Sequence, residues 1–283
     1  MAVCRRQTGV KLPMLIKRVI TSLVLAVIGI PAIILGGVYY FALMVFFLGV
    51  AAWEFGRIFG KVDSKVPEVL LIGCVFFIVM TRTFFPELAA AVLTLSILAS
   101  MTWHLLDYEK GRDRAATDFA VTIAGILYLG WIGAYLVNLR TMPGGLWWVL
   151  IVLPTIWLAD MAAYFVGIRF GKHPLSPRLS PKKTWEGYWA GVVFGTLTTA
   201  GLVVLWHSLG GPAVVWWKGA ALGAALSVFS TLGDLGESMF KRQAGMKDSS
   251  NIFPGHGGVL DRIDSWLWGA ALGYLLITWF LIK

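Results

Sequence analysis

Carboxylates gather in the segment Gly233 to Ser265, which lies between two long apolar stretches of the chain. Their oxygens are the hard ligands that Mg²⁺ prefers. Asp261 and Asp264 are three positions apart where the second apolar stretch begins, so they share a helix face and could bind one metal ion or bridge two. Asp234 ends the first stretch and could face them across the loop.

Cations and glycines in the same segment suit a phosphate ligand. Lys and Arg can neutralise phosphate oxygens that a metal does not reach. Glycines beside His256 let the backbone approach a ligand just before a helix N-terminus, whose free N–H groups favour an anion. The candidates are Lys241, Arg242, Lys247, His256, Gly257, Gly258 and Arg262. An alternative stays open, because acidic residues suit a helix start and cations suit lipid headgroups.

A second polar stretch, SPRLSPKKTWEG, runs from Ser176 to Gly187. Its adjacent Lys182 and Lys183 follow a proline and precede an apolar stretch, so they could grip a nucleotide triphosphate or a lipid phosphate. The alternative is a basic anchor at the membrane surface, with Ser180 or Thr184 capping the next helix.

Asp160 lies inside an apolar stretch, nine residues before Arg169 and therefore about 13 Å along a helix. A carboxylate at that depth costs about 2.5–3.5 kcal/mol on the lenient insertion scale, so it should face a polar cavity or a partner. We take Asp160, with Tyr164 one turn later, as a candidate site; a protonated structural hydrogen bond is the alternative. Five acidic residues near span ends are predicted to be interfacial: Glu54, Asp107, Glu109, Asp113 and Asp118.

The elements that carry these residues are membrane helices. The 283 residues are 58% hydrophobic and 14% charged, with a mean hydropathy of +0.77, outside the range of soluble domains. Continuous apolar runs of about 20 residues without strand alternation predict an all-α polytopic membrane protein with about nine spans. The spans are predicted at 15–36, 38–56, 66–81, 84–104, 117–139, 147–168, 186–207, 214–234 and 264–282.

The net charge of +9 has a topological explanation and gives no reason to expect nucleic acid. Most Lys and Arg residues fall on one side of a nine-span arrangement, which predicts a cytoplasmic N-terminus and a C-terminus on the opposite side. The exceptions are Arg82, Arg140, Lys218 and Lys283. Cys4 and Cys74 show no metal or redox spacing, and no disulfide is expected.

Polar residues are concentrated in the second half of the chain. We therefore predict a transmembrane scaffold over 1–116 and a catalytic half over 117–283, with cytoplasmic loops at 169–185 and 235–263. Glycine pairs spaced by four residues permit close helix packing, or alternatively a homodimer interface. The pairs are Gly191/Gly195, Gly219/Gly223 and Gly269/Gly273.

The charged segment closely resembles the signature of CDP-diacylglycerol synthases, also called phosphatidate cytidylyltransferases. The resemblance extends over some 27 residues, and a second recurrent stretch of that family resembles 180–187. The matching residues are Ser238, Lys241, Arg242, Lys247, Asp248, Pro254, His256, Gly257, Gly258, Asp261, Arg262 and Asp264.

This resemblance implies a Mg²⁺-dependent reaction, with room for a second cation, in which CTP and phosphatidic acid give CDP-diacylglycerol and pyrophosphate. It implies Asp234, Asp261 and Asp264 as metal ligands and makes Asp248 and Lys247 catalytic candidates beside them. The lipid would enter between helices near Asp160, and the site would face the cytoplasm of a bacterial inner membrane.

Three other functions compete with this one. A CTP-dependent lipid-alcohol kinase would need a base for its hydroxyl acceptor, and a CDP-alcohol phosphotransferase would carry a longer Asp array on one helix. A transporter could explain Asp160 and the glycine-rich spans, but not the dense charged segment at one membrane face.

Overall fold

The computed structural model describes residues 12–253 and 257–281, with side chains from residue 19 onward. The described chain is mainly helical. Its helices are α1 Leu12–Leu35, α2 Gly37–Gly60, α3 Glu68–Phe84, α4 Ala89–Glu109, α5 Ala115–Gly125, α6 Ala134–Thr141, α7 Gly145–Phe170, α8 Trp185–Ser208, α9 Trp216–Gln243 and α10 Leu260–Leu276. A 3₁₀ turn at Pro86–Leu88 precedes α4, and π-helical turns at Ile126–Ile132 and Ile277–Leu281 follow α5 and α10.

Six helical segments of the described chain are long and apolar enough to cross a membrane. They are Gly37–Gly60, Pro86–Glu109, Ala115–Thr141, Gly145–Phe170, Trp185–Ser208 and Trp216–Gln243. This confirms a polytopic helical membrane protein. Helices α1, α3 and α10 occupy the other three predicted ranges, and α3 and α10 have 17 residues each. The count of nine spans and their orientation stay predictions.

The all-α class is supported, and the described chain adds one short hairpin to its helices: β1 (Pro174–Ser176) pairs antiparallel with β2 (Ser180–Thr184). One sequence-based expectation differs from the structure. The predicted loop 235–263 is shorter, because α9 continues to Gln243 and α10 begins at Leu260. Falling hydropathy marks the end of the apolar stretch, but Leu, Glu, Met, Lys and Arg are good helix formers and carry the helix onward.

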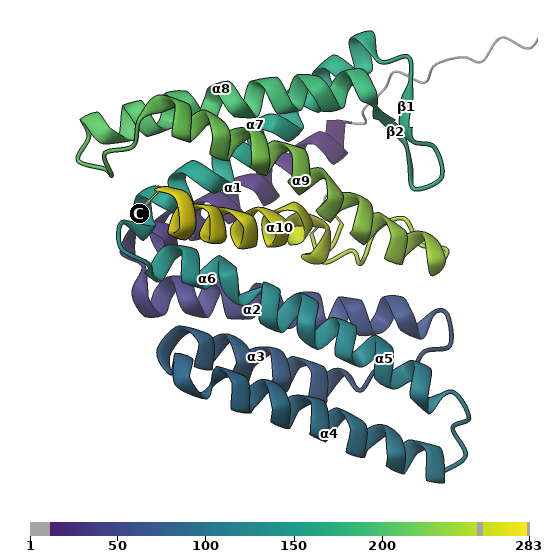
Figure 1. Cartoon of the computed structure of the whole chain (residues 1–283). Coiled ribbons are helices and arrows are strands. Elements are labelled where there is room, and N and C mark those ends of the chain that lie inside the picture. The colour runs from purple at the N-terminus through teal and green to yellow at the C-terminus, as the bar shows by residue number, and fades with distance from the viewer. Residues whose placement is uncertain (1–11, 254–256, 282–283) are drawn as a thin grey trace, which may run out of the picture.

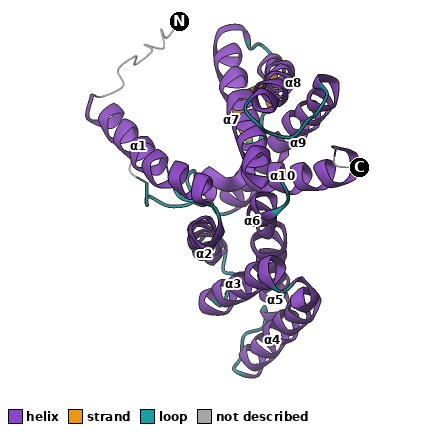
Figure 2. Cartoon of the chain, turned by 90° about the vertical axis from the view of Figure 1, so that its left-hand side faces the viewer, coloured by secondary structure: helices purple, strands orange, loops and turns teal. Residues whose placement is uncertain are grey.

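The helices form two groups with α10 between them (Figure 1). One group contains α2 to α6 and the other contains α7 to α9, while α1 leans away from both (Figure 2). The buried core joins the groups, with side chains such as Phe55, Ile78, Trp148 and Leu267 fully or almost fully enclosed. Because α10 contacts both groups, its first turn is placed from two sides.

The predicted glycine pairs lie at helix contacts within this one chain. A Cβ on Gly195 of α8 would lie 1.9 Å from Ser227 Oγ of α9, and one on Gly223 of α9 would lie 2.3 Å from Thr199 Oγ1 of α8. A Cβ on Gly273 of α10 would lie 2.9 Å from a Val152 methyl of α7. These contacts support close helix packing as the role of the glycines.

The hairpin, the end of α9 and the start of α10 lie at the same end of the molecule as the α2–α3 and α4–α5 turns (Figure 1). Those two turns are joined by Arg112, which donates to Asp118 Oδ2 at 2.7 Å and to Asp63 Oδ1 at 3.1 Å. Hydrogen bonding and charge from Arg112, with help from Arg114, hold the pKa of Asp63 below its ordinary value of 3.8.

Cations at the opposite end cap helix termini. Arg140 Nε donates to the Ile33 carbonyl at 2.7 Å and Nη2 donates to the Ile34 carbonyl at 3.1 Å, both at the end of α1. Lys218 Nζ donates to the Phe280 carbonyl at 3.3 Å. Arg140 and Lys218, two of the exceptions to the charge asymmetry, therefore donate to carbonyl groups at helix ends and offset their partial negative charge.

Candidate active site

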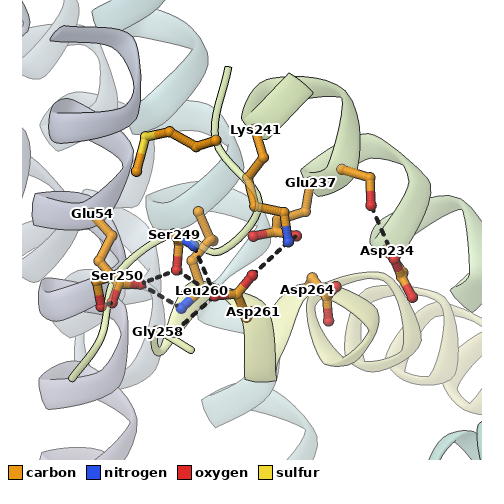
Figure 3. A network of polar contacts seen from close by, with 12 residues as sticks. Glu54, Asp234, Glu237, Lys241, Ser249, Ser250, Gly258, Leu260, Asp261 and Asp264 are labelled. Carbon is orange, nitrogen blue, oxygen red and sulfur yellow. Dashed lines mark hydrogen bonds and ion pairs between the residues drawn. The ribbon is translucent and has the colours of Figure 1, made fainter. Parts of the chain in front are cut away.

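Lys241 of α9 lies between two carboxylates (Figure 3). Its Nζ atom is 2.5 Å from Asp261 Oδ1 of α10 and also contacts Glu237 one turn earlier on α9. All three side chains are buried, with Glu237 fully so. The sequence interpretation missed Glu237 because it ended the helix at Asp234; with α9 extended, Glu237 and Lys241 have the i, i+4 spacing of a helical ion pair.

Asp261 also holds the backbone of the preceding loop. Its Oδ2 atom accepts the N–H groups of Ser249 at 2.9 Å and Gly258 at 2.8 Å, and the Ser249 hydroxyl at 2.8 Å. Gly257 has φ +82°, and a Cβ there would lie 2.6 Å from Asp261 Oδ2. The predicted close backbone approach is present, and the group approached is this carboxylate.

A second acidic group lies beside the first. Asp234 of α9 pairs through Oδ2 with Lys183 of β2 at 2.6 Å, and its Oδ1 accepts from Ser238 at 3.3 Å. Helices α9 and α10 touch here, since a Cβ on Gly233 would lie 2.6 Å from the Asp264 carbonyl oxygen. The charges of Asp234, Asp160 and Lys183 all act on the buried Asp264 carboxyl group.

This second group fits a cation by its charge. The charges of Asp160, Asp234 and Asp264 act on one another beside one ammonium group, Lys183, so a divalent cation would offset their repulsion. Within 12–253 and 257–281, no three Asp, Glu, His or Cys side chains are already arranged around a metal position. Asp261 is turned toward Lys241 and the loop N–H groups instead.

The predicted residues of the hairpin lie at this end of the molecule but differ in their contacts and exposure. Thr184 caps α8 by accepting the Gly187 N–H at 3.2 Å, so the capping alternative is confirmed for Thr184. Lys183 points to Asp234, whereas Lys182 is exposed and Ser180 is partly buried.

The other predicted residues lie around the site or apart from it. Arg242 binds backbone, donating to the Leu179 carbonyl at 3.2 Å and the Met246 carbonyl at 3.0 Å. Lys247, Asp248 and Arg262 are exposed. Tyr164 is 63% exposed and its ring contacts Phe165. Among the described residues, no polar contact joins Tyr164 to the acidic groups. His256 lies outside the described residues.

Glu54 of α2 is a residue whose place the sequence interpretation misjudged. It was expected at the interface but is fully buried, and its carboxylate contacts the loop that leads into α10 (Figure 3). The same correction applies to Asp118, which is fully buried against Arg112, and to Asp107, which is 7% exposed. An isolated acidic residue near the end of an apolar stretch carries no signal of a partner so distant in sequence.

Known proteins resemble this sequence along almost the whole chain. A model of the Cytidylyltransferase family matches residues 16–280. The chain belongs to the cytidylyltransferase family. A phosphatidate cytidylyltransferase of Pseudomonas aeruginosa is 40% identical over 261 residues, covering 89% of this chain and 93% of the relative.

Two further family members come from distant bacteria. A phosphatidate cytidylyltransferase of Brucella suis is 36% identical over 276 residues, covering 91% of each chain. One of Mycobacterium leprae is 32% identical over 248 residues, covering 81% of this chain and 76% of the relative. The resemblance found in the charged segment is therefore confirmed over most of the chain.

Proposed function

We propose that this cytidylyltransferase transfers the cytidylyl group of CTP to phosphatidate, giving CDP-diacylglycerol and pyrophosphate. The names of its relatives support the two substrates. The observation that carries the proposal is the ion pair between Lys183 of the hairpin and Asp234 of α9, at 2.6 Å, beside the contact of α9 with Asp264 of α10. The charge of Asp160 on α7 acts on the same carboxylates. An excess of carboxylates beside lysine suits a metal-bound triphosphate.

The reaction needs little proton transfer. Phosphatidate brings an anionic oxygen, which forms a bond to the α-phosphorus of CTP as the bond from that phosphorus to the bridging oxygen of the β-phosphate breaks. Pyrophosphate leaves with that oxygen. The barrier lies in bringing two polyanions together, so positioning and charge neutralisation must dominate.

The chain supplies cations for both phosphates. Lys183 can leave Asp234 for a phosphate, since both side chains are partly exposed. Exposed Lys182, Lys247 and Arg262 lie on the hairpin and on the segments that flank the loop. We assign them to the phosphate groups of CTP and of the lipid, with His256, Asp248 and Arg242 completing or ordering the site.

Mg²⁺, when bound, supplies charge neutralisation to the triphosphate and the leaving pyrophosphate. Asp234 and Asp264 would hold it, with Asp160 close enough to add its charge. Asp261, the third predicted ligand, would have to exchange Lys241 or a loop donor for the metal. A second cation would find its ligands in the same carboxylates. Lys241, which neutralises Asp261 in the structure, keeps the two acidic groups from repelling each other.

The membrane arrangement follows from charge. We propose nine spans with a cytoplasmic N-terminus, which puts the hairpin and the acidic groups at the cytoplasmic face of a bacterial inner membrane. CTP then enters from the cytosol, while phosphatidate remains in the bilayer and presents its headgroup near Asp160. The division into a supporting part, 1–116, and a catalytic part, 117–283, belongs to this proposal.

The test uses CTP labelled at different phosphates with purified protein and phosphatidate. We expect α-labelled CTP to label the lipid and γ-labelled CTP to release labelled pyrophosphate without labelling the lipid. A lipid kinase would give the reverse pattern and refute the proposal. Asp264→Asn should lower incorporation at least about 100-fold, and Asp113→Asn, at an exposed turn residue, should leave it unchanged.

A further inference from the structure

Glu54 of α2 receives four hydrogen bonds from one loop (Figure 3). Its carboxylate accepts the N–H groups of Val259 at 3.0 Å and Leu260 at 2.7 Å. It also accepts the hydroxyl groups of Ser249 at 3.0 Å and Ser250 at 2.5 Å. Glu54 therefore binds both ends of the loop 249–260, although it is fully buried on a helix of the other group.

The contact supplies a missing helix cap. The first N–H groups of a helix have no partner within it, and Val259, at the start of α10, has no side-chain cap bond of its own. A carboxylate from α2 takes the place of the usual capping side chain, and its charge suits the positive end of the helix dipole. The first turn of α10 carries Asp261, and Asp264 follows at the start of the next turn, so the position of both depends on α2.

Ser249 connects Glu54 to the site. Its hydroxyl lies 3.0 Å from Glu54 Oε2 and 2.8 Å from Asp261 Oδ2, while its N–H donates to the same Asp261 oxygen at 2.9 Å. Gly258 packs tightly against this pair, since a Cβ there would lie 2.1 Å from Ser249 Oγ and 2.3 Å from Glu54 Oε1. The carboxylates of Glu54 and Asp261 thus hold the two ends of the loop together.

We propose that Glu54 is a positioning residue for cytidylyl transfer: its carboxylate fixes residues 249–250 and 259–260, at the two ends of the loop, and with them the start of α10 that carries Asp261 and Asp264. Glu54 touches neither substrate. This inference rests on the proposed function only for the assay, because the hydrogen bonds that define it are independent of which substrates are used.

The effect of Glu54 can be separated from general packing. The other buried residues of α2 are apolar or small, including Leu48, Ala51, Ala52 and Phe55, and they hold the helix without Glu54. Each carboxylate oxygen accepts one backbone N–H, Val259 on Oε1 and Leu260 on Oε2. Glutamine keeps the size of the side chain but replaces one of these oxygens by an NH₂ group, so one backbone hydrogen bond must be lost, although a serine hydroxyl can turn to accept. Aspartate keeps the charge with a shorter reach.

The experiment compares Glu54→Gln and Glu54→Asp in the purified full chain. Because a misplacement of about 1 Å can cost about 100-fold, we expect Glu54→Gln to lower kcat by about 50-fold or more. KM for CTP should rise less than kcat falls, because Glu54 reaches CTP only through the start of α10, and Glu54→Asp should recover part of both losses. Glu68→Gln is the matched control, since Glu68 packs beside Gly56, on the other side of α2.

A double-mutant cycle with Ser250→Ala keeps the proposal testable if Glu54→Gln folds poorly. Ser250→Ala alone should lower kcat several-fold with the thermal midpoint almost unchanged, and its effect should disappear in the Glu54→Asp background if the shortened carboxylate no longer reaches the hydroxyl. Three results would overturn the proposal: near-normal turnover in Glu54→Gln, equal loss in Glu54→Gln and Glu54→Asp, or no effect of Ser250→Ala. Failure of the proposed function would instead appear as wild-type protein without cytidylyl transfer.

Discussion

Replacing Gly258 by alanine tests the geometry of the loop before α10. The added methyl group would lie 2.1 Å from Ser249 Oγ and 2.3 Å from Glu54 Oε1. Ordinary contacts are about 3.5–4.0 Å, so the loop or the ends of these two side chains must move by more than about 1 Å. The hydrogen bonds from Val259 and Leu260 to Glu54 would then exceed hydrogen-bonding distance.

The size of the effect follows from those two bonds. A hydrogen bond to a charged group contributes about 1.5–3 kcal/mol, so the loss of both removes about 3–6 kcal/mol of local stabilisation. Because a displacement of 1 Å in a catalytic group can cost about 100-fold in rate, we expect Gly258→Ala to lower cytidylyl transfer by about that factor. Its thermal midpoint in detergent should also fall.

The assay is incorporation of α-labelled CTP into lipid by purified protein, with the thermal midpoint measured on the same samples. Gly236→Ala is the matched control, because a Cβ at Gly236 of α9 meets nothing within 4 Å and alanine favours a helix by about 0.5–1 kcal/mol. Turnover in Gly258→Ala above half that of the wild type would refute the reasoning.

Three further outcomes are expected. Lys241→Met leaves the buried carboxylates of Asp261 and Glu237 without their cation, which costs about 3–5 kcal/mol. The thermal midpoint of this variant should therefore fall well below that of the control Lys182→Met, at an exposed lysine. Equal midpoints would contradict this. Asp63→Asn, which keeps a side chain suited to φ 59°, should have a lower thermal midpoint than the wild type at pH 7. This difference should vanish as the pH falls below 3.8, because a carboxyl group whose pKa is depressed by Arg112 loses its stabilising effect when protonated. A difference in midpoint that persists at low pH would show that the charge is irrelevant. Gly195→Leu should prevent α8 from packing on α9 and reduce the amount of folded protein in the membrane, whereas Gly201→Leu, at an open position of α8, should not. Full folding of Gly195→Leu with a change only in oligomeric state would instead favour a dimer interface.

The sequence predicted the helices well because apolar stretches mark them directly. Each of the nine predicted ranges contains a helix, including α3 and α10 at 17 residues. It misplaced the end of α9, because hydropathy detects the membrane and not the helix: Glu237 and Lys241 continue the helix with polar side chains. The hairpin was missed because its strands have three and five residues and contain prolines.

The site was predicted as a set of residues and not as an arrangement. Asp261 and Asp264 were correctly expected at the start of one helix, and Asp234 follows Gly233, where α9 touches that helix. Sequence spacing could not show that Asp261 binds Lys241 and the loop, or that Asp264 lies within range of Asp160. Glu54 was beyond reach, since its partners lie 195 to 206 residues away in the chain.

That separation has a consequence for the synthesis of the protein. Glu54 enters the membrane surface with α2, but its first hydrogen-bond donors are made 195 residues later. At about 5–20 residues per second, the carboxylate waits about 10–40 s for the loop that will enclose it. During that time it must stay in contact with water at the membrane surface. Helix α10 therefore completes the burial of a charge that α2 carries.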